Sequence, residues 1–307
     1  MSSIIAIISS ILVTLFLIPS RFTPDEKSVT HFTLSDSIRI DVIAYGDGQG
    51  LIETYGAHIV SPVCEEGKCY TIEIELFWDL IGRFHHYDTI SGKGLTKLDH
   101  IPFTISDYIK LSDILNNSHS LLASYSKEEL VKSTRSSAID GVTGATNEEI
   151  QESVIGGAVF SCHTLWHIAY GPVLDSLRKV TTLLLSKELV VKLVNQQDQE
   201  INYFLIKNIS EDDFGIYLPE VFKAIEDGRG YFAKNAIEKI PDEFISDTLS
   251  QEFFASHFSQ LDYFAQVALL EKLNVLSLSK AMILALKENT DDRNSYKNHL
   301  IESLLAE

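Results

Sequence analysis

Cysteine and positive charge are both scarce in this chain. Only 3 of its 307 residues are cysteines, too few for a cysteine-rich zinc module or a disulfide-dense scaffold. Lys and Arg number 25 against 43 Asp and Glu, which gives a formal net charge of −18. Nucleic acids and anionic membrane surfaces require a concentrated positive face, so this balance argues against unaided binding to either. A small anion held by a few backbone amides remains compatible with it.

Three widespread catalytic signatures are missing as well. The sequence contains no G-x-S-x-G nucleophile elbow, no G-x-x-x-x-G-K phosphate loop and no G-x-G-x-x-G dinucleotide fingerprint. With 45% hydrophobic and 22% charged residues, the composition is that of a globular protein, and the length suits about two domains.

One long apolar run lies near the N-terminus, at residues 4–18. It is shorter than the roughly 20 residues of a membrane-spanning helix and similar to the apolar core of a signal peptide. We expect residues 1–24 to be a signal peptide or N-terminal anchor, which places the protein in a periplasm or on the outer side of a membrane. The alternative is a buried N-terminal strand or helix.

Export makes a disulfide between Cys64 and Cys69 feasible, because Gly67 can turn the short loop between them. A metal site there is disfavoured, since two thiols do not fill a tetrahedral shell and the chain has no second cysteine pair. We expect Cys162 to stay free as a small buried apolar residue.

Strand-like alternation dominates the first part of the chain. It predicts strands within residues 29–60, with a turn at 45–50, and another strand at 70–78. Residues 82–100 show little periodicity and are predicted to form a loop. Helical spacing predicts a helix over 106–115 and a short one over 127–130.

Helical spacing takes over after residue 172. The predicted helices are 173–186, 187–196, 200–208, 214–226, 229–239, 243–257, 261–274, 277–288 and 293–305. We therefore expect an α+β domain over 25–172 and an all-α domain over 173–307. Successive short amphipathic helices resemble HEAT or armadillo-type repeats, and an irregular helical bundle is the alternative.

The segment with most chemical information is 138–150, AIDGVTGATNEEI. Gly141 and Gly144 permit a tight backbone path. Thr146 precedes apolar residues at helical spacing that continue to Ala169, and Thr146 with Glu149 fits a capping box. A glycine-rich turn at a helix start is also a place where backbone amides and the helix dipole can hold a phosphate.

Residues 140–146 resemble the D-x-x-[ST]-G-A-T motif of FMN-binding domains, which occur in the flavin subunits of sodium-pumping NADH:quinone reductase and of Rnf complexes. In that family a flavin transferase links the phosphate of FMN to the last threonine of the motif. The resemblance implies covalent FMN on Thr146, with recognition and turn roles for Asp140, Thr143, Gly144 and Ala145.

The same resemblance implies an exported electron-transfer protein, an oxidoreductase component that meets a flavin transferase and a redox partner protein. The alternative is a non-catalytic binding or scaffold protein in which Thr146 is only a helix N-cap.

Other candidate residues lie outside the motif. Arg83, Lys93 and Lys97 form a basic group within residues 78–103 and could neutralise a phosphate. Asp99 beside His100 could fix a histidine tautomer. Trp166 or Tyr170 could form an aromatic wall beside a flavin.

A weaker alternative is a metal-dependent enzyme. His163 and His167 stand at i, i+4 on one predicted helix and could share a metal ion. Packing of these side chains between helix and sheet is the favoured interpretation.

Overall fold

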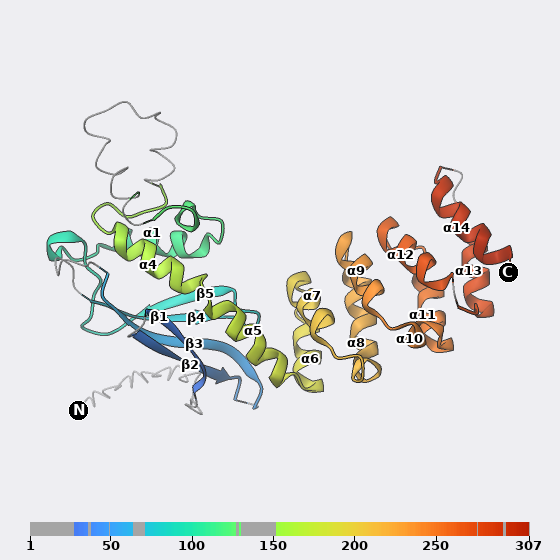
Figure 1. Cartoon of the computed structure of the whole chain (residues 1–307), viewed down its shortest axis with the longest axis horizontal. Coiled ribbons are helices and arrows are strands. Elements are labelled where there is room, and N and C mark those ends of the chain that lie inside the picture. Colours follow the sequence, from blue (N-terminus) through green and yellow to red (C-terminus); the bar gives the residue numbers. More distant parts are fainter. Residues whose placement is uncertain are drawn as a thin grey trace, which may run out of the picture.

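The computed structural model describes residues 28–35, 38–48, 50–63, 71–126, 129, 152–274, 276–290 and 293–306. Strands come first and helices follow (Figure 1), which confirms an α+β part followed by an all-α part. The predictions for residues 4–18, the Cys64–Cys69 pair, the helix at 127–130 and the motif at 138–150 lie outside the described residues. Among the helices that are described, none combines the length and apolarity needed to cross a bilayer.

The described strands form one antiparallel five-stranded sheet in which sequence neighbours are also spatial neighbours. They are β1 (Ser28–Ser35), β2 (Ile38–Gly46), β3 (Ile52–Ser61), β4 (Ile72–Trp78) and β5 (Phe84–Thr89). In β4 every second side chain is buried, from Ile72 to Trp78. Trp78 lies opposite Tyr55 of β3, and neither side chain is exposed, so this pair marks the centre of the core.

The prediction of a loop over 82–100 is wrong for β5. This strand pairs with β4 along its length, yet none of its side chains is fully buried. The two aromatic residues of this edge strand, Phe84 and Tyr87, are three positions apart and so fall on opposite faces, and the sequence therefore lacks the alternation by which strands are identified. The remainder of the segment is irregular and contains a 3₁₀ turn at Leu98–His100.

Three helices complete the sheet domain: α1 (Ile105–Asn116), α4 (Val159–Ala169) and α5 (Val173–Leu184). α1 packs against β5 and α4, and α5 packs against β1. α1 begins with a capping box, in which the Asp107 amide donates to the Thr104 hydroxyl and the Thr104 amide to the Asp107 carboxylate.

The expected continuous helix from Thr146 to Ala169 is wrong in its middle, because residues 153–158 are not helical and α4 begins only at Val159. Gly156 and Gly157 stand just before the N-cap Ala158, and the φ of +78° at Gly157 interrupts a continuous helix there. Cys162 is confirmed as a buried free thiol on α4, and burial raises its pKa to about 12.

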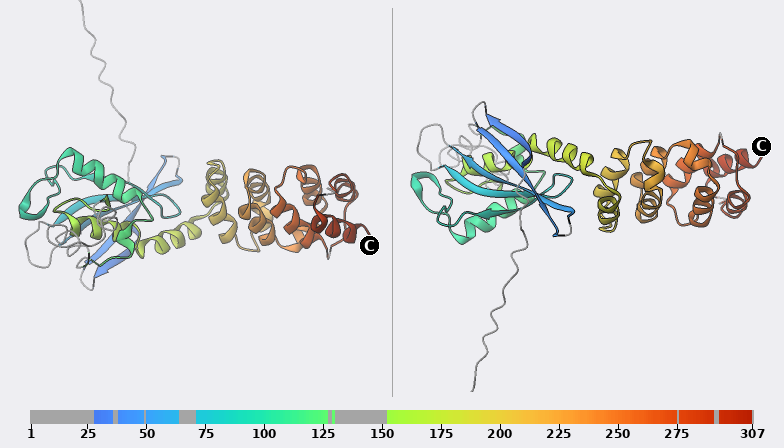
Figure 2. Two further views of the ribbon diagram at one scale, coloured as in Figure 1. Left: turned by 90° about the horizontal axis from the view of Figure 1, so that it is seen from above. Right: turned by 90° about the horizontal axis from the view of Figure 1, so that it is seen from below.

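The rest of the chain is a helical array that extends away from the sheet (Figures 1 and 2). Its helices are α6 (Lys187–Val194), α7 (Gln199–Asn208), α8 (Phe214–Asp227), α9 (Tyr231–Lys239), α10 (Asp242–Ser246), α11 (Thr248–His257), α12 (Tyr263–Leu273), α13 (Lys280–Glu288) and α14 (Ser295–Ala306). Four of these helices pack side by side in one row, in the order α7, α9, α12 and α14. The single helix predicted over 243–257 is two helices, because Asp247 caps a new start with its side chain.

The buried apolar residues form two clusters. One extends from Phe32 to Leu205 and joins the sheet, α4, α5, α6 and α7. The other extends from Ile206 to Leu304. The first three helices after residue 172 therefore share the core of the sheet domain, and the array is attached to the sheet through packed side chains.

Candidate functional site

The flavin motif itself lies in residues that the structure does not describe, so Thr146, Asp140, Thr143, Gly144 and Ala145 are not placed. The structure describes the chain again from Glu152, and we call the segment from Glu152 through Gly157 into α4 the continuation of the motif.

The continuation packs against the loop at 95–103. The Leu98 amide donates to the Gly157 carbonyl at 2.7 Å, and the Lys97 amide to the Ile101 carbonyl at 2.7 Å. These bonds hold two exposed residues at the loop tip, Asp99 and His100, with φ of 57° and 61°. Left-handed backbone at non-glycine residues costs on the order of 1 kcal/mol or more and is found where the surroundings enforce it.

A hollow of about 460 Å³ opens beside the same continuation. The described residues that line it are Asp113, Ile114, Asn117, His119, Ser120, Leu121, Glu152 and Ser153. This volume falls in the range of roughly 300–1,000 Å³ of small-ligand sites. The described lining includes two carboxylates and no Lys or Arg, so it is better suited to an uncharged ring than to a phosphate.

Lys97 stands on the loop that packs against the continuation, but its ammonium group is already paired with a carboxylate of α1. Its Nζ is 2.8 Å from Asp107 Oδ1. Burial of the Asp107 carboxyl acts to raise its pKa, yet hydrogen bonds from Lys97 and Thr104 outweigh burial and hold the pKa at about 2. The third basic residue of the predicted group, Lys93, lies 3.2 Å from Glu73.

Four aromatic side chains on α4 share one arrangement. Each donates to a backbone carbonyl of the segment 115–125: His163 Nε2 to Tyr125 (3.1 Å), Trp166 Nε1 to Asn117 (2.9 Å), His167 Nε2 to Leu122 (2.9 Å) and Tyr170 OH to Leu115 (2.6 Å). Carbonyl oxygens only accept hydrogen bonds, so both Nε2 atoms carry hydrogen. These donors replace the backbone partners that an irregular segment otherwise lacks.

This arrangement favours packing over a metal site for His163 and His167, although their hydrogen-bond partners lie in the segment 115–125 and not in the sheet as predicted. Their rings are in contact, with centroids 4.2 Å apart, and both Nε2 atoms are engaged. In the part of the chain that the structure describes, no three His, Cys, Asp or Glu side chains are grouped so that they could hold a metal ion. Trp166 is 5% exposed and lies against Tyr170, so it faces packed protein.

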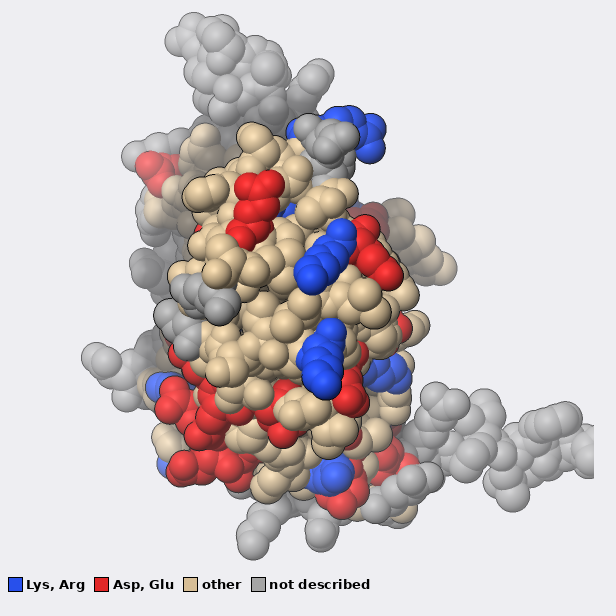
Figure 3. All heavy atoms as spheres, turned by 90° about the vertical axis from the view of Figure 1, so that its right-hand side faces the viewer, with Lys and Arg blue, Asp and Glu red and all other residues tan. Residues whose placement is uncertain are grey.

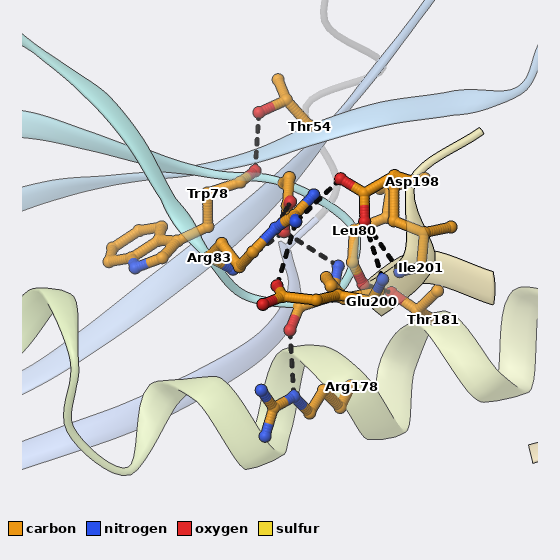
Figure 4. A network of polar contacts seen from close by, with 11 residues as sticks. Thr54, Trp78, Leu80, Arg83, Arg178, Thr181, Asp198, Glu200 and Ile201 are labelled. Carbon is orange, nitrogen blue, oxygen red and sulfur yellow. Dashed lines mark hydrogen bonds and ion pairs between the residues drawn. The ribbon is translucent and has the colours of Figure 1, made fainter. Parts of the chain in front are cut away.

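Arg83 lies at the junction between the sheet and the helical array (Figure 4). Its Nε is 2.6 Å from Asp79 Oδ2, and its Nη1 is 2.9 Å from Asp198 Oδ2 and 3.0 Å from Glu200 Oε2. Burial acts to lower the pKa of Arg83, but Asp79 and Asp198 outweigh it and raise the pKa above its usual value. Asp198 also caps α7. Arg83 thus ties β5 and its preceding turn to the array.

A second group of contacts at the junction runs from β3 to α5. Tyr55 OH lies 2.8 Å from Thr181 Oγ1, which donates to the Leu80 carbonyl at 2.5 Å. Thr181 has one hydroxyl hydrogen and uses it on Leu80, so Tyr55 must be the donor in the first bond. Arg178 Nε donates to the Ile81 carbonyl at 3.0 Å, next in the same turn (Figure 4).

The described candidates therefore do not form one phosphate site. Arg83 lies at the junction, Lys97 is bound to α1, and Trp166 is packed on the segment 115–125. Arg83 and Lys97 both pair with carboxylates of the same chain, the expected result where acids outnumber bases 43 to 25.

A larger groove, which the sequence did not indicate, follows the junction. It has a volume of about 1030 Å³ and is lined by side chains of α5, α7 and α9 together with Ile81. Its residues are separated by up to 154 positions in the chain, from Ile81 to Asn235, and no local pattern connects them.

No family model, curated protein or solved structure matches this chain. The assignment of function accordingly depends on the motif, the contacts and the surfaces described above.

Proposed function

We propose that this chain is an exported electron-transfer protein that carries FMN covalently on Thr146. The observation that carries the proposal is the segment Asp140–Thr146, which satisfies every defined position of the D-x-x-[ST]-G-A-T motif. Bound FMN would accept and pass electrons, while the protein sets its surroundings. The apolar run at residues 4–18 supports export, and the partners would be a flavin transferase and a redox protein.

Different parts of the chain would hold the phosphate and the ring of such a group. Arg83 and Lys97 have carboxylate partners, so the phosphate would depend on backbone amides of the glycine turn at residues 141–144. The hollow beside Glu152 has the volume of a small-ligand site, and its described lining would suit the uncharged ring of such a group. Asp99 and His100 stand on the loop that packs against the same continuation and would contribute polar groups near it.

Intact mass spectrometry tests the proposal directly. The full chain is co-expressed with a flavin transferase, and an FMN-sized mass increase is expected in the wild type and in Thr134→Ala, a matched threonine outside the motif. It is expected to be absent in Thr146→Ala. A wild type without the increase, or a Thr146→Ala variant that keeps it, would overturn the proposal.

A second candidate is a non-catalytic binding or scaffold protein built on HEAT-like repeats. It is favoured by the row of stacked helices and by the internal bonding of His163, His167, Arg83 and Lys97. In this case Thr146→Ala removes only a helix cap and lowers stability by about 0.5–2 kcal/mol. The purified protein would be colourless after co-expression with the transferase, whereas the flavoprotein would absorb in the flavin bands.

A further inference from the structure

The groove between α5, α7 and α9 has a wall of exposed apolar and aromatic side chains. Leu183 is 84% exposed, Tyr231 68% and Tyr203 44%, and all three line it. Large apolar side chains at this exposure are common singly, but a cluster inside a groove marks a binding surface. Tyr231 is stacked on Phe264 of α12 with ring centroids 5.0 Å apart, so the aromatic wall continues beyond the groove along the same row of helices.

The groove also concentrates positive charge in an acidic protein. Arg178, Lys179 and Lys207 line it, and none of the three forms an ion pair within the described residues. By contrast, the two basic residues nearest the sheet side of the junction, Arg83 and Lys192, both bind carboxylates.

The acidic side chains of the groove offset only part of this charge. Asp175 and Glu200 line it, and Glu200 is bound to Arg83. Elsewhere the array is acidic: Asp and Glu gather on the lower part of its C-terminal end (Figure 3). Three cations that have no carboxylate partner among the described residues are therefore a local exception in a chain of net charge −18.

The spacing of the aromatic wall suits an extended polypeptide. Tyr203 and Tyr231 are on neighbouring helices, whose axes typically lie 8–10 Å apart. An extended chain presents side chains to one face at every second residue, roughly 6.6 Å apart, so two apolar residues at alternate positions can reach both tyrosine rings. A volume of about 1030 Å³ is at the upper limit of small-molecule sites, so the groove has room for a segment of several residues.

We propose that this groove binds an extended segment of a partner protein in which aspartate or glutamate alternates with aromatic or aliphatic residues. The carboxylates pair with Lys179 and Lys207, and the apolar side chains lie on Leu183, Tyr203 and Tyr231. Nucleic acid is a poor occupant because the surrounding surface is acidic. The proposal does not depend on flavin at Thr146, so its test is independent of the test of the proposed electron-transfer function.

A random peptide display selection on the immobilised full chain tests the proposal and requires no named partner. Enriched peptides are expected to carry acidic residues and at least one aromatic or large aliphatic residue. The counter-selection uses Lys179→Glu/Lys207→Glu, which reverses the groove charge, and the matched control is Lys280→Glu/Lys287→Glu, two exposed lysines on α13. Enrichment is expected with the wild type and the control and not with the groove variant.

The best enriched peptide is then labelled and titrated by fluorescence anisotropy. Lys179→Glu/Lys207→Glu is expected to weaken its binding by about tenfold or more, with a weaker salt dependence than the wild type. Tyr203→Ala/Tyr231→Ala tests the apolar contribution, and circular dichroism verifies that each variant is folded. No enrichment, enrichment of basic peptides, or an enriched peptide that binds the groove variants and the wild type equally would each overturn the proposal.

Discussion

Replacing Thr181 with valine is the sharpest test of the junction between sheet and array. Valine keeps the shape of threonine and removes only the hydroxyl. That hydroxyl donates to the Leu80 carbonyl and accepts from Tyr55, and both Thr181 and Tyr55 are fully buried. The substitution therefore leaves one buried donor and one buried acceptor without partners.

The number of buried groups left unpaired sets the expected loss in the free energy of unfolding. An unpaired buried polar group costs about 1–3 kcal/mol, so two such groups predict a loss of about 2–6 kcal/mol for Thr181→Val. Tyr55→Phe removes the phenol and leaves the bond from Thr181 to Leu80 intact, so it should lose only about 1 kcal/mol. In the double variant Tyr55 no longer contributes an unpaired hydroxyl, so its loss should be smaller than the sum of the two single losses.

Tryptophan fluorescence during urea unfolding measures these losses for the relevant part of the molecule. The chain has two tryptophans, Trp78 and Trp166, and both belong to the core shared by the sheet and α4 to α7. Burial raises the pKa of Tyr55 to about 12, so the phenol stays protonated through the assay. A Thr181→Val variant within 0.5 kcal/mol of the wild type, or strictly additive losses in the double variant, would refute the relay from Tyr55 through Thr181 to Leu80.

Three further predictions concern other contacts. Gln251→Leu removes a buried side-chain amide whose oxygen accepts from the Ser279 amide at 2.6 Å, so the free energy of unfolding should fall by about 1–3 kcal/mol. Urea unfolding followed by far-UV circular dichroism should show this loss, whereas the transition followed by tryptophan fluorescence should change little. The pKa of the Asp107 carboxyl is about 2 in the folded protein against 3.8 ordinarily, so the stability it contributes is present above its ordinary pKa and is lost as the pH falls toward 2. Melting temperatures measured over a pH series should show this loss. In Lys97→Met the acid-induced drop in melting temperature should be smaller. Arg83→Met should lower the free energy of unfolding by about 1 kcal/mol, a modest loss because the pair is partly exposed; urea unfolding followed by tryptophan fluorescence measures it, and high salt should narrow the difference from the wild type.

The sequence was most informative where a local signal decides the structure. The helices of the array begin after side chains that cap them, such as Ser186, Asp198, Asp262 and Ser279. Apolar spacing alone placed most helix boundaries within a few residues of the observed ones. The spacing of His163, Trp166, His167 and Tyr170 also puts all four on one helix face, although their partners, the carbonyls of an irregular segment, carry no sequence signal.

Long-range polar contacts were beyond the reach of the sequence. Arg83 was expected to be available for a phosphate because its neighbours in the sequence are basic and aromatic. Its carboxylate partners include Asp198, which lies 115 positions further along the chain and is brought near by the packing of α7 on the sheet domain. β5 was missed for a related reason, since only its pairing with β4 distinguishes it from a polar loop.

The junction connects these features to the proposed docking groove. Ile81 forms part of the groove, its carbonyl accepts from Arg178, and Leu80 beside it accepts from Thr181. The turn that carries Leu80 and Ile81 is in turn held by Arg83 and Asp79. A substitution at Arg83 should therefore shift the sheet-side wall of the groove relative to α7 and α9 and weaken peptide binding, although Arg83 itself is not among the residues that line it. The position of the array relative to the sheet is thus itself a determinant of the surface that a partner would meet.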